Sequence, residues 1–164
     1  METYRVPAGT GIGHVHLKVS DIDRAIAFYT NVLGFDQIMR LGDQAAFVSA
    51  GGYHHHVGLN TWLSRGGSPA APQHTGLFHF AILYPTRRDL ATATRRVIEA
   101  GVRIQGVADH GVSESIYLAD PDGNGIELTR DRPQAEWPRD SDGNIALAMA
   151  DPLDLNALLR EASL

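Results

Sequence analysis

The sequence predicts an α+β fold built from two βαβββ modules, and three observations lead to this prediction. Short runs in which apolar and polar residues alternate indicate strands, and two longer runs with helical spacing lie among them. The order of one strand, one helix and three strands occurs twice along the chain. A chain of 164 residues, 43% of them hydrophobic, is long enough for one well-buried core, so we expect both modules within a single domain over 1–164.

The first module is expected at about 11–63. In its first strand, 12–19, alternation separates an apolar side (Val15, Leu17, Val19) from a polar side (His14, His16, Lys18). Asp21 can cap the helix that follows, and Gly34 ends it. Three further strands are predicted at 35–41, 44–50 and 54–62, separated by turn residues such as Gly42-Asp43 and Gly51-Gly52.

The second module is expected at about 75–131, after a loop rich in Gly, Pro and Ser. Its strand is predicted at 77–84 and its helix at about 87–100, closed by Gly101. Strands near 102–108, 114–119 and 125–130 complete it, and Asp120-Pro-Asp-Gly-Asn forms the last turn. In the tail, 132–164, a short amphipathic helix at 152–162 is predicted to dock on the modules.

Composition excludes several classes of function. The net charge is −5 and no block of Lys and Arg occurs, which argues against nucleic acid as the main partner and favours a small ligand. No stretch approaches the roughly 20 apolar residues of a membrane span, so no membrane partner and a cytoplasmic location are expected. The absence of cysteine leaves His, Asp and Glu as the available metal ligands.

Several chemically active side chains occupy the polar side of predicted strands. His14 precedes Val15, His79 lies between Phe78 and Phe80, Tyr117 between Ile116 and Leu118, and Glu127 between Ile126 and Leu128. If the apolar sides pack under the helices, these four side chains point to the inner face of a curved sheet. A buried His or Glu needs a partner, and a divalent cation is one. Two imidazoles and one carboxylate leave about half of a six-coordinate sphere open, which is the arrangement associated with non-haem Fe(II) and O2 chemistry.

Each residue also has a simpler explanation. A single inward histidine is often a hydrogen-bonded structural residue, since histidine is commonly intermediate in burial. Glu127 alone could be an exposed strand residue, because one face of an antiparallel sheet is often solvated. The run His54-His55-His56 could reflect surface alternation. The joint pattern across both modules is what favours a metal site.

The motifs over about 11–133 resemble the vicinal oxygen chelate superfamily, which includes glyoxalase I, extradiol ring-cleaving dioxygenases, and fosfomycin and bleomycin resistance proteins. The motifs on which this resemblance rests are Gly-His-Val-His-Leu-Lys-Val-Ser-Asp (13–21), Ala-Phe-Tyr (27–29) with Leu-Gly-Phe (33–35), Leu-Phe-His-Phe-Ala (77–81) and Asp-Pro-Asp-Gly-Asn-Gly-Ile-Glu-Leu (120–128). The chain as a whole is similar to small two-module catechol 2,3-dioxygenases. The resemblance implies a curved, partly open barrel of mixed β-sheet around a metal site.

Carried over residue by residue, the resemblance implies that His14, His79 and Glu127 are the metal ligands, with Fe(II) as the ion and Mn(II) as the alternative. His14 takes this role rather than His16 because it keeps the family's spacing to Ser20-Asp21. Glyoxalase I enzymes carry a further glutamate ligand where this chain has Gly58, which cannot ligate.

The extradiol members imply three catalytic residues. His56 matches their acid-base histidine and Tyr117 their tyrosine one strand before the carboxylate ligand. His110 is the nearest candidate for a second histidine before that tyrosine, although its spacing is shorter than in the larger enzymes. Trp62 and Phe47 are expected in the pocket walls.

The resemblance therefore implies extradiol cleavage of a catechol or substituted catechol by Fe(II) and O2, giving a 2-hydroxymuconic semialdehyde type product. The partners are then a small aromatic diol and O2. Two alternatives stay open at this point: a glyoxalase I-like metal-dependent lyase, isomerase or thiol transferase, and a non-catalytic protein that binds an antibiotic. Whether the modules pair within one chain or between chains is also open, and the family leads us to expect a homodimer or a larger homo-oligomer.

Overall fold

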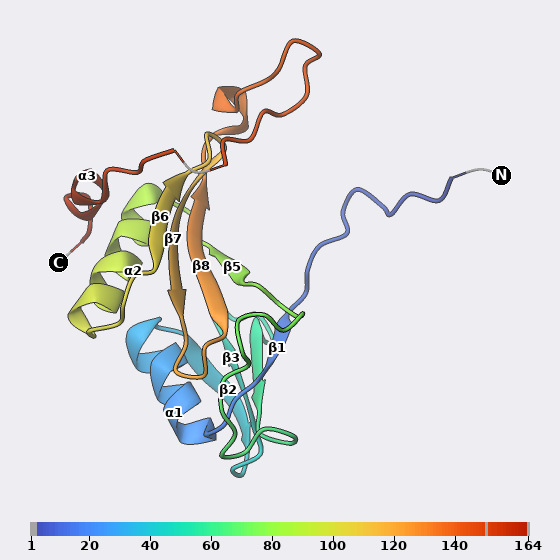
Figure 1. The fold of residues 1–164 in the computed structure, drawn as a ribbon, viewed down its shortest axis with the longest axis vertical. Coiled ribbons are helices and arrows are strands. Elements are labelled where there is room, and N and C mark those ends of the chain that lie inside the picture. Colours follow the sequence, from blue (N-terminus) through green and yellow to red (C-terminus); the bar gives the residue numbers. More distant parts are fainter. Residues whose placement is uncertain (1–2, 150, 164) are drawn as a thin grey trace.

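A computed structural model describes residues 3–149 and 151–163, and its first module has the predicted order of elements (Figure 1). It comprises β1 (Val15–Lys18), α1 (Ile22–Ala27), which continues as the π-helical turn η1 (Phe28–Val32), β2 (Asp36–Leu41), β3 (Ala45–Ser49) and β4 (Val57–Asn60). The four strands form one sheet in the order β1-β4-β3-β2, with β1 parallel to β4 and the other pairs antiparallel.

The second module repeats this arrangement with β5 (Phe80–Leu83), α2 (Arg87–Glu99), β6 (Gly106–Asp109), β7 (Ser113–Ala119) and β8 (Gly125–Asp131). Its sheet has the equivalent order β5-β8-β7-β6, again with a single parallel pair. The prediction of two βαβββ modules is confirmed, and both sheets are mixed. The predicted strand at 102–108 is partly wrong, because ladder pairing with β7 begins only at Gly106.

Local sequence signals mark the ends of both helices, and those predicted at Asp21, Gly34 and Gly101 are confirmed. Asp21 accepts a hydrogen bond from the backbone N–H of Arg24 and caps α1, and Thr86 caps α2 in the same way through Asp89. Gly34 and Gly101 follow the two helices with φ of 83° and 72°, in the left-handed region that glycine adopts without strain. In β1, Leu17 is buried while His16 and Lys18 are exposed, so the alternation is also confirmed.

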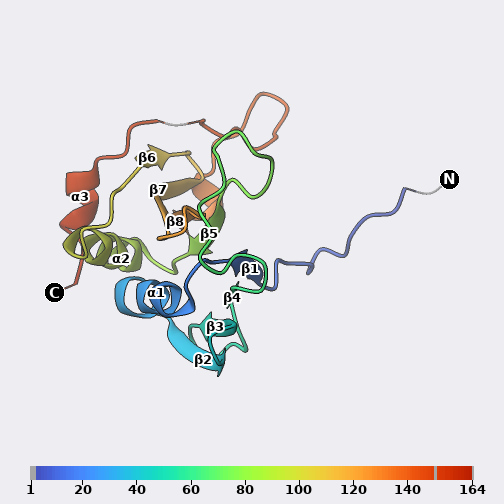
Figure 2. The same cartoon turned by 60° about the horizontal axis from the view of Figure 1, so that its bottom comes forward.

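The two helices lie side by side and bring the modules together through one hydrophobic core (Figure 2). Tyr29 and Leu33 of the first module and Leu90 and Val97 of the second belong to the same buried cluster. The apolar face of each sheet therefore turns toward the helices, and its polar face turns away from them.

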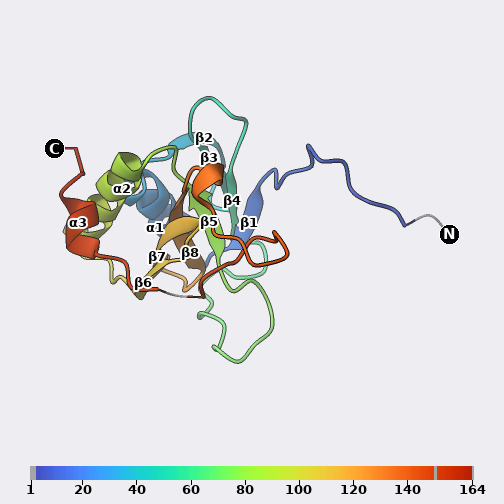
Figure 3. The same cartoon turned by 90° about the horizontal axis from the view of Figure 1, so that it is seen from above.

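The tail contains η2 (Gln134–Glu136) and α3 (Leu155–Leu159), and α3 lies against α2 (Figure 3). Leu153 and Leu158 are buried there, while the guanidinium of Arg95 donates to the Leu159 carbonyl oxygen. The predicted docking of the tail through its leucines is confirmed. Among the described residues, no helix is both long and apolar enough to span a membrane.

Candidate metal centre

His79 and Glu127 meet on the polar face of the second sheet. Nε2 of His79 lies 3.1 Å from Oε2 of Glu127, and the two side chains are 31% and 13% exposed. Glu127 is in the middle of β8, between the buried Ile126 and Leu128, so alternation turns its carboxylate away from α2. Gly125 allows His79 to lie close to β8, because a Cβ on residue 125 would be only 3.0 Å from the Cβ of His79.

Tyr117 is the cross-strand neighbour of Glu127 and extends the cluster. Its hydroxyl lies 3.2 Å from Oε1 of Glu127 and 2.7 Å from Nε2 of His110. Burial, followed by the negative charge of Glu127, raises the pKa of the Tyr117 hydroxyl. The phenol therefore stays protonated at neutral pH and can act as a hydrogen-bond donor.

The hydrogen bonds of His110 fix its tautomer. Nδ1 lies 2.8 Å from the carbonyl oxygen of Ala148, which can only accept a hydrogen bond, so Nδ1 carries a proton. In neutral His110, Nε2 is then an acceptor for the Tyr117 hydroxyl. Because the hydroxyl has a single proton, it donates either to His110 or to Glu127, and the proton can move between these two hydrogen bonds.

The donor set of His79 and Glu127 fits a divalent ion. Two ligand atoms about 2.1 Å from one ion and at right angles to each other lie about 3 Å apart, close to the separation found here. One imidazole nitrogen and one carboxylate oxygen suit Fe(II), Mn(II) or Zn(II), and further ligands would be needed to complete the sphere.

His14 lies apart from this pair, on the polar side of the first module. Its ring packs against that of His55, with centroids 4.4 Å apart, and its side chain is exposed. Over 3–149 and 151–163, no three His, Asp or Glu side chains are close enough together to hold one ion. The structure thus brings together two of the three predicted ligands with Tyr117 and His110, and it leaves the role of His14 as a prediction.

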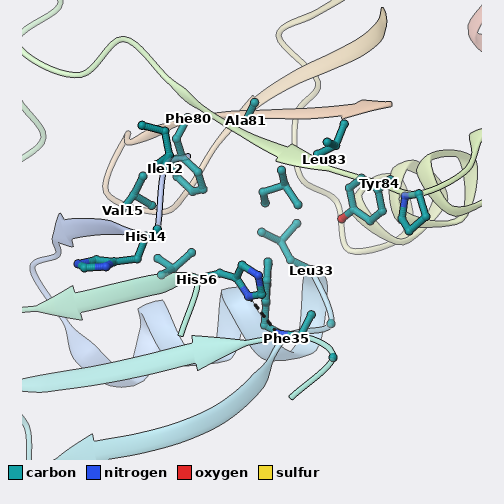
Figure 4. A pocket seen from close by; sticks show the side chains of 17 residues that line it. Ile12, His14, Val15, Leu33, Phe35, His56, Phe80, Ala81, Leu83 and Tyr84 are labelled. Carbon is teal, nitrogen blue, oxygen red and sulfur yellow. Dashed lines mark hydrogen bonds between the residues drawn. The ribbon is translucent and has the colours of Figure 1, made fainter. Parts of the chain in front are cut away.

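His56 occupies a pocket between the modules, of about 600 Å³, whose walls include Leu33, Phe35 and Phe80. Figure 4 shows its ring facing Leu33, whereas the His14 imidazole points away from these side chains. Nδ1 of His56 accepts from the backbone N–H of Ala50 at 3.3 Å and lies 2.9 Å from the hydroxyl of Ser49. Since the amide can only donate, neutral His56 carries its proton on Nε2. Its catalytic role stays a prediction.

The row of side chains around Gly58 shows what replaces a carboxylate in the first module. His16, Gly58 and Phe47 are register partners, as Ala81, Glu127 and Tyr117 are in the second module. A Cβ on Gly58 would lie 2.9 Å from Cγ of His16, so the imidazole occupies the space above the glycine.

The aromatic side chains predicted for the pocket walls surround His16. Its ring lies 5.7 Å from that of Phe47 and 5.5 Å from that of Trp62. Burial and then the nearby His14 lower the pKa of His16, so this ring is neutral at pH 7.

Sequence reasoning missed three contacts of these residues. His55 is half-buried against His14 and Phe47, and partial burial followed by the charges of neighbouring histidines lowers its pKa. Ser49 orients His56, and Ala148 orients His110. The run of three histidines was a sequence signal for the contact of His55. The contacts of Ser49 with His56 and of Ala148 with His110 have no such signal, because the local sequence does not predict which segments lie side by side.

Comparison with known proteins identifies the family of the chain. The model of the "Glyoxalase/Bleomycin resistance protein/Dioxygenase superfamily" matches residues 11–128. The chain is 42% identical over 153 residues to a catechol-2,3-dioxygenase of Bacillus subtilis (strain 168), covering 93% of this chain and 52% of the relative. It is 29% identical over 120 residues to biphenyl-2,3-diol 1,2-dioxygenase 3 of Rhodococcus globerulus, covering 73% of this chain and 63% of the relative. The chain thus spans about half to three fifths of the length of these relatives.

A solved structure shows the same fold. It is that of a variant of the fosfomycin resistance protein FosX from Listeria monocytogenes, complexed with Mn(II) and 1S,2S-dihydroxypropylphosphonic acid. The TM-score is 0.56 at 22% identity, and the match covers 73% of this chain and 88% of FosX. Because the family model matches well over half of the sequence, the chain belongs to the glyoxalase/bleomycin resistance protein/dioxygenase superfamily.

Proposed function

We propose that the protein is an extradiol dioxygenase that cleaves catechol or a substituted catechol with O2, giving a 2-hydroxymuconic semialdehyde type product. The observation that carries the proposal is the cluster in which Glu127 contacts both His79 and Tyr117, with His110 behind the tyrosine. The similarity to a catechol-2,3-dioxygenase over 93% of the chain supports the same reaction.

The proposed ligands are His14, His79 and Glu127, which would hold Fe(II), with Mn(II) as the alternative. When bound, the ion would supply two effects: it makes a coordinated diol easier to deprotonate, and it offers vacant positions to the diol and O2. The barrel around the ion would be completed if the polar face of a first module and the polar face of a second module faced each other.

Tyr117 and His110 would handle a proton next to the diol. The Tyr117 hydroxyl is held between an imidazole and a carboxylate. It can transfer its proton to a substrate oxygen and be reprotonated by His110 when that ring is an imidazolium, which carries a second proton on Nε2; His110 is then left neutral. Because the Ala148 carbonyl oxygen keeps Nδ1 of His110 protonated, the His110 ring does not need to rotate during this exchange. The pair would therefore place a proton at one defined oxygen of the substrate.

His56 would serve as the second acid-base group. A histidine imidazole can accept or donate a proton near neutral pH. The backbone N–H of Ala50 holds neutral His56 with its proton on Nε2, so the neutral ring acts first as a donor unless the Ala50 bond is released.

The glyoxalase-like alternative is less well supported. Its additional carboxylate ligand would have to replace Gly58, and the His16 ring occupies that space. A non-catalytic antibiotic-binding role does not require His110, Tyr117 and Glu127 to be linked by hydrogen bonds.

The proposal is tested by loading the protein with Fe(II) under anaerobic conditions, adding catechol, and recording O2 uptake together with formation of a yellow product. We expect equal amounts of O2 and catechol to be consumed. Binding of the ion and of catechol without any O2 uptake would contradict the proposal.

Two variants assign the residues within the same assay. Glu127→Gln should abolish metal retention, because an amide is a much weaker ligand than a carboxylate. His56→Ala should keep the metal and lose most of the turnover, by about 10²-fold or more for a lost acid-base group. Unchanged turnover in His56→Ala would remove that residue from the mechanism. His16→Ala is the control for His14→Ala, and only the latter should release the ion.

A further inference from the structure

We propose that the pocket between the two modules is a second binding site, which takes a neutral aromatic molecule with hydroxyl groups at two separate positions and needs no metal. The inference goes beyond the proposed function, because this pocket and the metal centre are formed by different side chains. The His14 imidazole points away from the pocket in Figure 4. Among the described residues that line it, none belongs to the cluster of His79, Glu127, Tyr117 and His110.

The walls of the pocket are mainly apolar and come from both modules. Leu33, Phe35 and Val57 belong to the first module, and Phe80 and Ile82 belong to the second. The volume of about 600 Å³ falls within the range of about 300–1,000 Å³ that is usual for small-molecule sites. Such sites combine apolar walls with a few polar groups that orient the ligand. The two phenylalanine rings can pack against the face or the edge of an aromatic ligand.

His56 provides one polar group of the pocket. Its hydrogen bonds with the described residues, to the Ser49 hydroxyl and the Ala50 backbone N–H, both use Nδ1. In neutral His56 the proton is therefore on Nε2. Because Nδ1 is directed toward Ala50, Nε2 is the ring nitrogen that can donate a hydrogen bond to an oxygen atom of a ligand.

Tyr84 provides the second polar group, from the other module. No described residue forms a hydrogen bond with its hydroxyl, and the oxygen is not enclosed by protein atoms. In Figure 4 the hydroxyl points toward the middle of the pocket. Burial raises the pKa of Tyr84 to about 12, so the hydroxyl is protonated at neutral pH and can both donate and accept a hydrogen bond.

The charge of the walls decides which class of ligand fits. Of the described residues, no Asp, Glu, Lys or Arg lines the pocket. Arg96 acts electrostatically on Tyr84, but its guanidinium donates to the carbonyl oxygens of Asn31 and Val32 at 2.6 and 3.1 Å. A carboxylate, phosphate or ammonium group in the pocket would lose hydration without gaining a partner of opposite charge. Phenolic hydroxyls are neutral at pH 7, as the tyrosine side chain is, and they suit both His56 and Tyr84.

The test is calorimetric titration of the full-length protein, freed of metal and kept in excess chelator. The probe is 2,6-dihydroxynaphthalene, whose hydroxyls are too far apart to chelate one ion. We expect saturable binding of one molecule per chain, and nuclear Overhauser effects between the probe and the rings of Phe35 and Phe80. Tyr84→Phe should weaken binding by about fivefold, the effect of one neutral hydrogen bond.

Two controls separate this pocket from other sites. Tyr117→Phe makes the same substitution at the metal centre and should leave the affinity for the probe unchanged. The second control is 6-hydroxy-2-naphthoate, in which a carboxylate replaces one hydroxyl, and it should bind at least about tenfold more weakly because the walls offer no counter-charge.

Three results would overturn the inference: no saturable binding of the probe, equal affinities of wild type and Tyr84→Phe, or tighter binding of the carboxylate. The oxygen-uptake assay of the metal-loaded protein is independent of these measurements. A protein that binds the probe without metal but does not cleave catechol supports the second site and contradicts the dioxygenase function.

Discussion

Gly125→Ala should disrupt the candidate metal centre through a single methyl group. A Cβ at this position would overlap the carbonyl oxygen of Phe78 and lie 3.0 and 3.1 Å from Cβ and Cα of His79. Ordinary contact requires the chain at 78–79 to move by about 1 Å, since carbon atoms pack at about 3.5–4.0 Å. That displacement carries the imidazole of His79 away from Glu127.

The expected consequences are a loss of stability and a larger loss of function. Overpacking of this size costs about 1–3 kcal/mol, which lowers the melting temperature by about 2–12 °C for a chain of this length. A shift of about 1 Å in a ligand reduces turnover by about 10²-fold, and metal retention should fall with it. Thermal unfolding, metal analysis and the oxygen electrode measure the three effects on the same sample.

Gly106→Ala is the control. It lies in the same sheet, and its added Cβ would meet only Cδ2 of Tyr117 at 3.7 Å, an ordinary contact. We expect near wild-type metal content in this variant. Full metal content and turnover in Gly125→Ala would refute the placement of His79 against the start of β8.

Two further predictions concern stability. Tyr29→Phe removes a buried hydrogen bond to Asp120 and should cost about 2 kcal/mol of stability, or about 4–8 °C in melting temperature. The control is Tyr53→Phe, at a partly exposed ring, which should change the melting temperature little. Equal melting temperatures for both variants would contradict the role of this contact between the modules. Burial alone would raise the pKa of Asp109, but the Gly111 amide and the Arg132 guanidinium outweigh it and lower the pKa. The resulting stabilisation is present above the unfolded pKa of about 3.9 and is lost as the pH falls through the lower folded value. We therefore expect Asp109→Asn to be less stable than wild type at pH 7, and the difference in stability to shrink on acidification. Unfolding measured between neutral and acid pH tests this. A difference in stability that stays constant with pH would show that this carboxylate is not the group responsible.

Much of the second half of the candidate site was predictable from spacing alone. Glu127 and Tyr117 sit between buried residues in strands that pair directly, so period-two alternation suffices to place both side chains on one face. His110 was the least secure assignment, because its position depends on the Ala148 carbonyl, which lies 38 residues away.

The positions of His14 and His56 relative to each other could not be predicted from the local sequence. Both were assigned to one centre, yet the His14 ring lies against His55 and the His56 ring lies on the pocket between the modules. His56 directly precedes β4, where its backbone hydrogen-bonds to Val48 and Val15. Its side chain hydrogen-bonds with Ser49 and with the backbone of Ala50, at the end of the neighbouring strand.

By itself, the sequence determined the two modules, the ends of their helices and which side chains each strand turns away from its helix, since these depend on residues a few positions apart. Only the tertiary structure decided how the two sheets are placed relative to each other. That placement follows from the shared core of α1 and α2 and from contacts such as Tyr29 with Asp120, which join residues far apart in the chain. Such packing has no periodic signature, and it is what separates His14 from His79 and Glu127 within one chain.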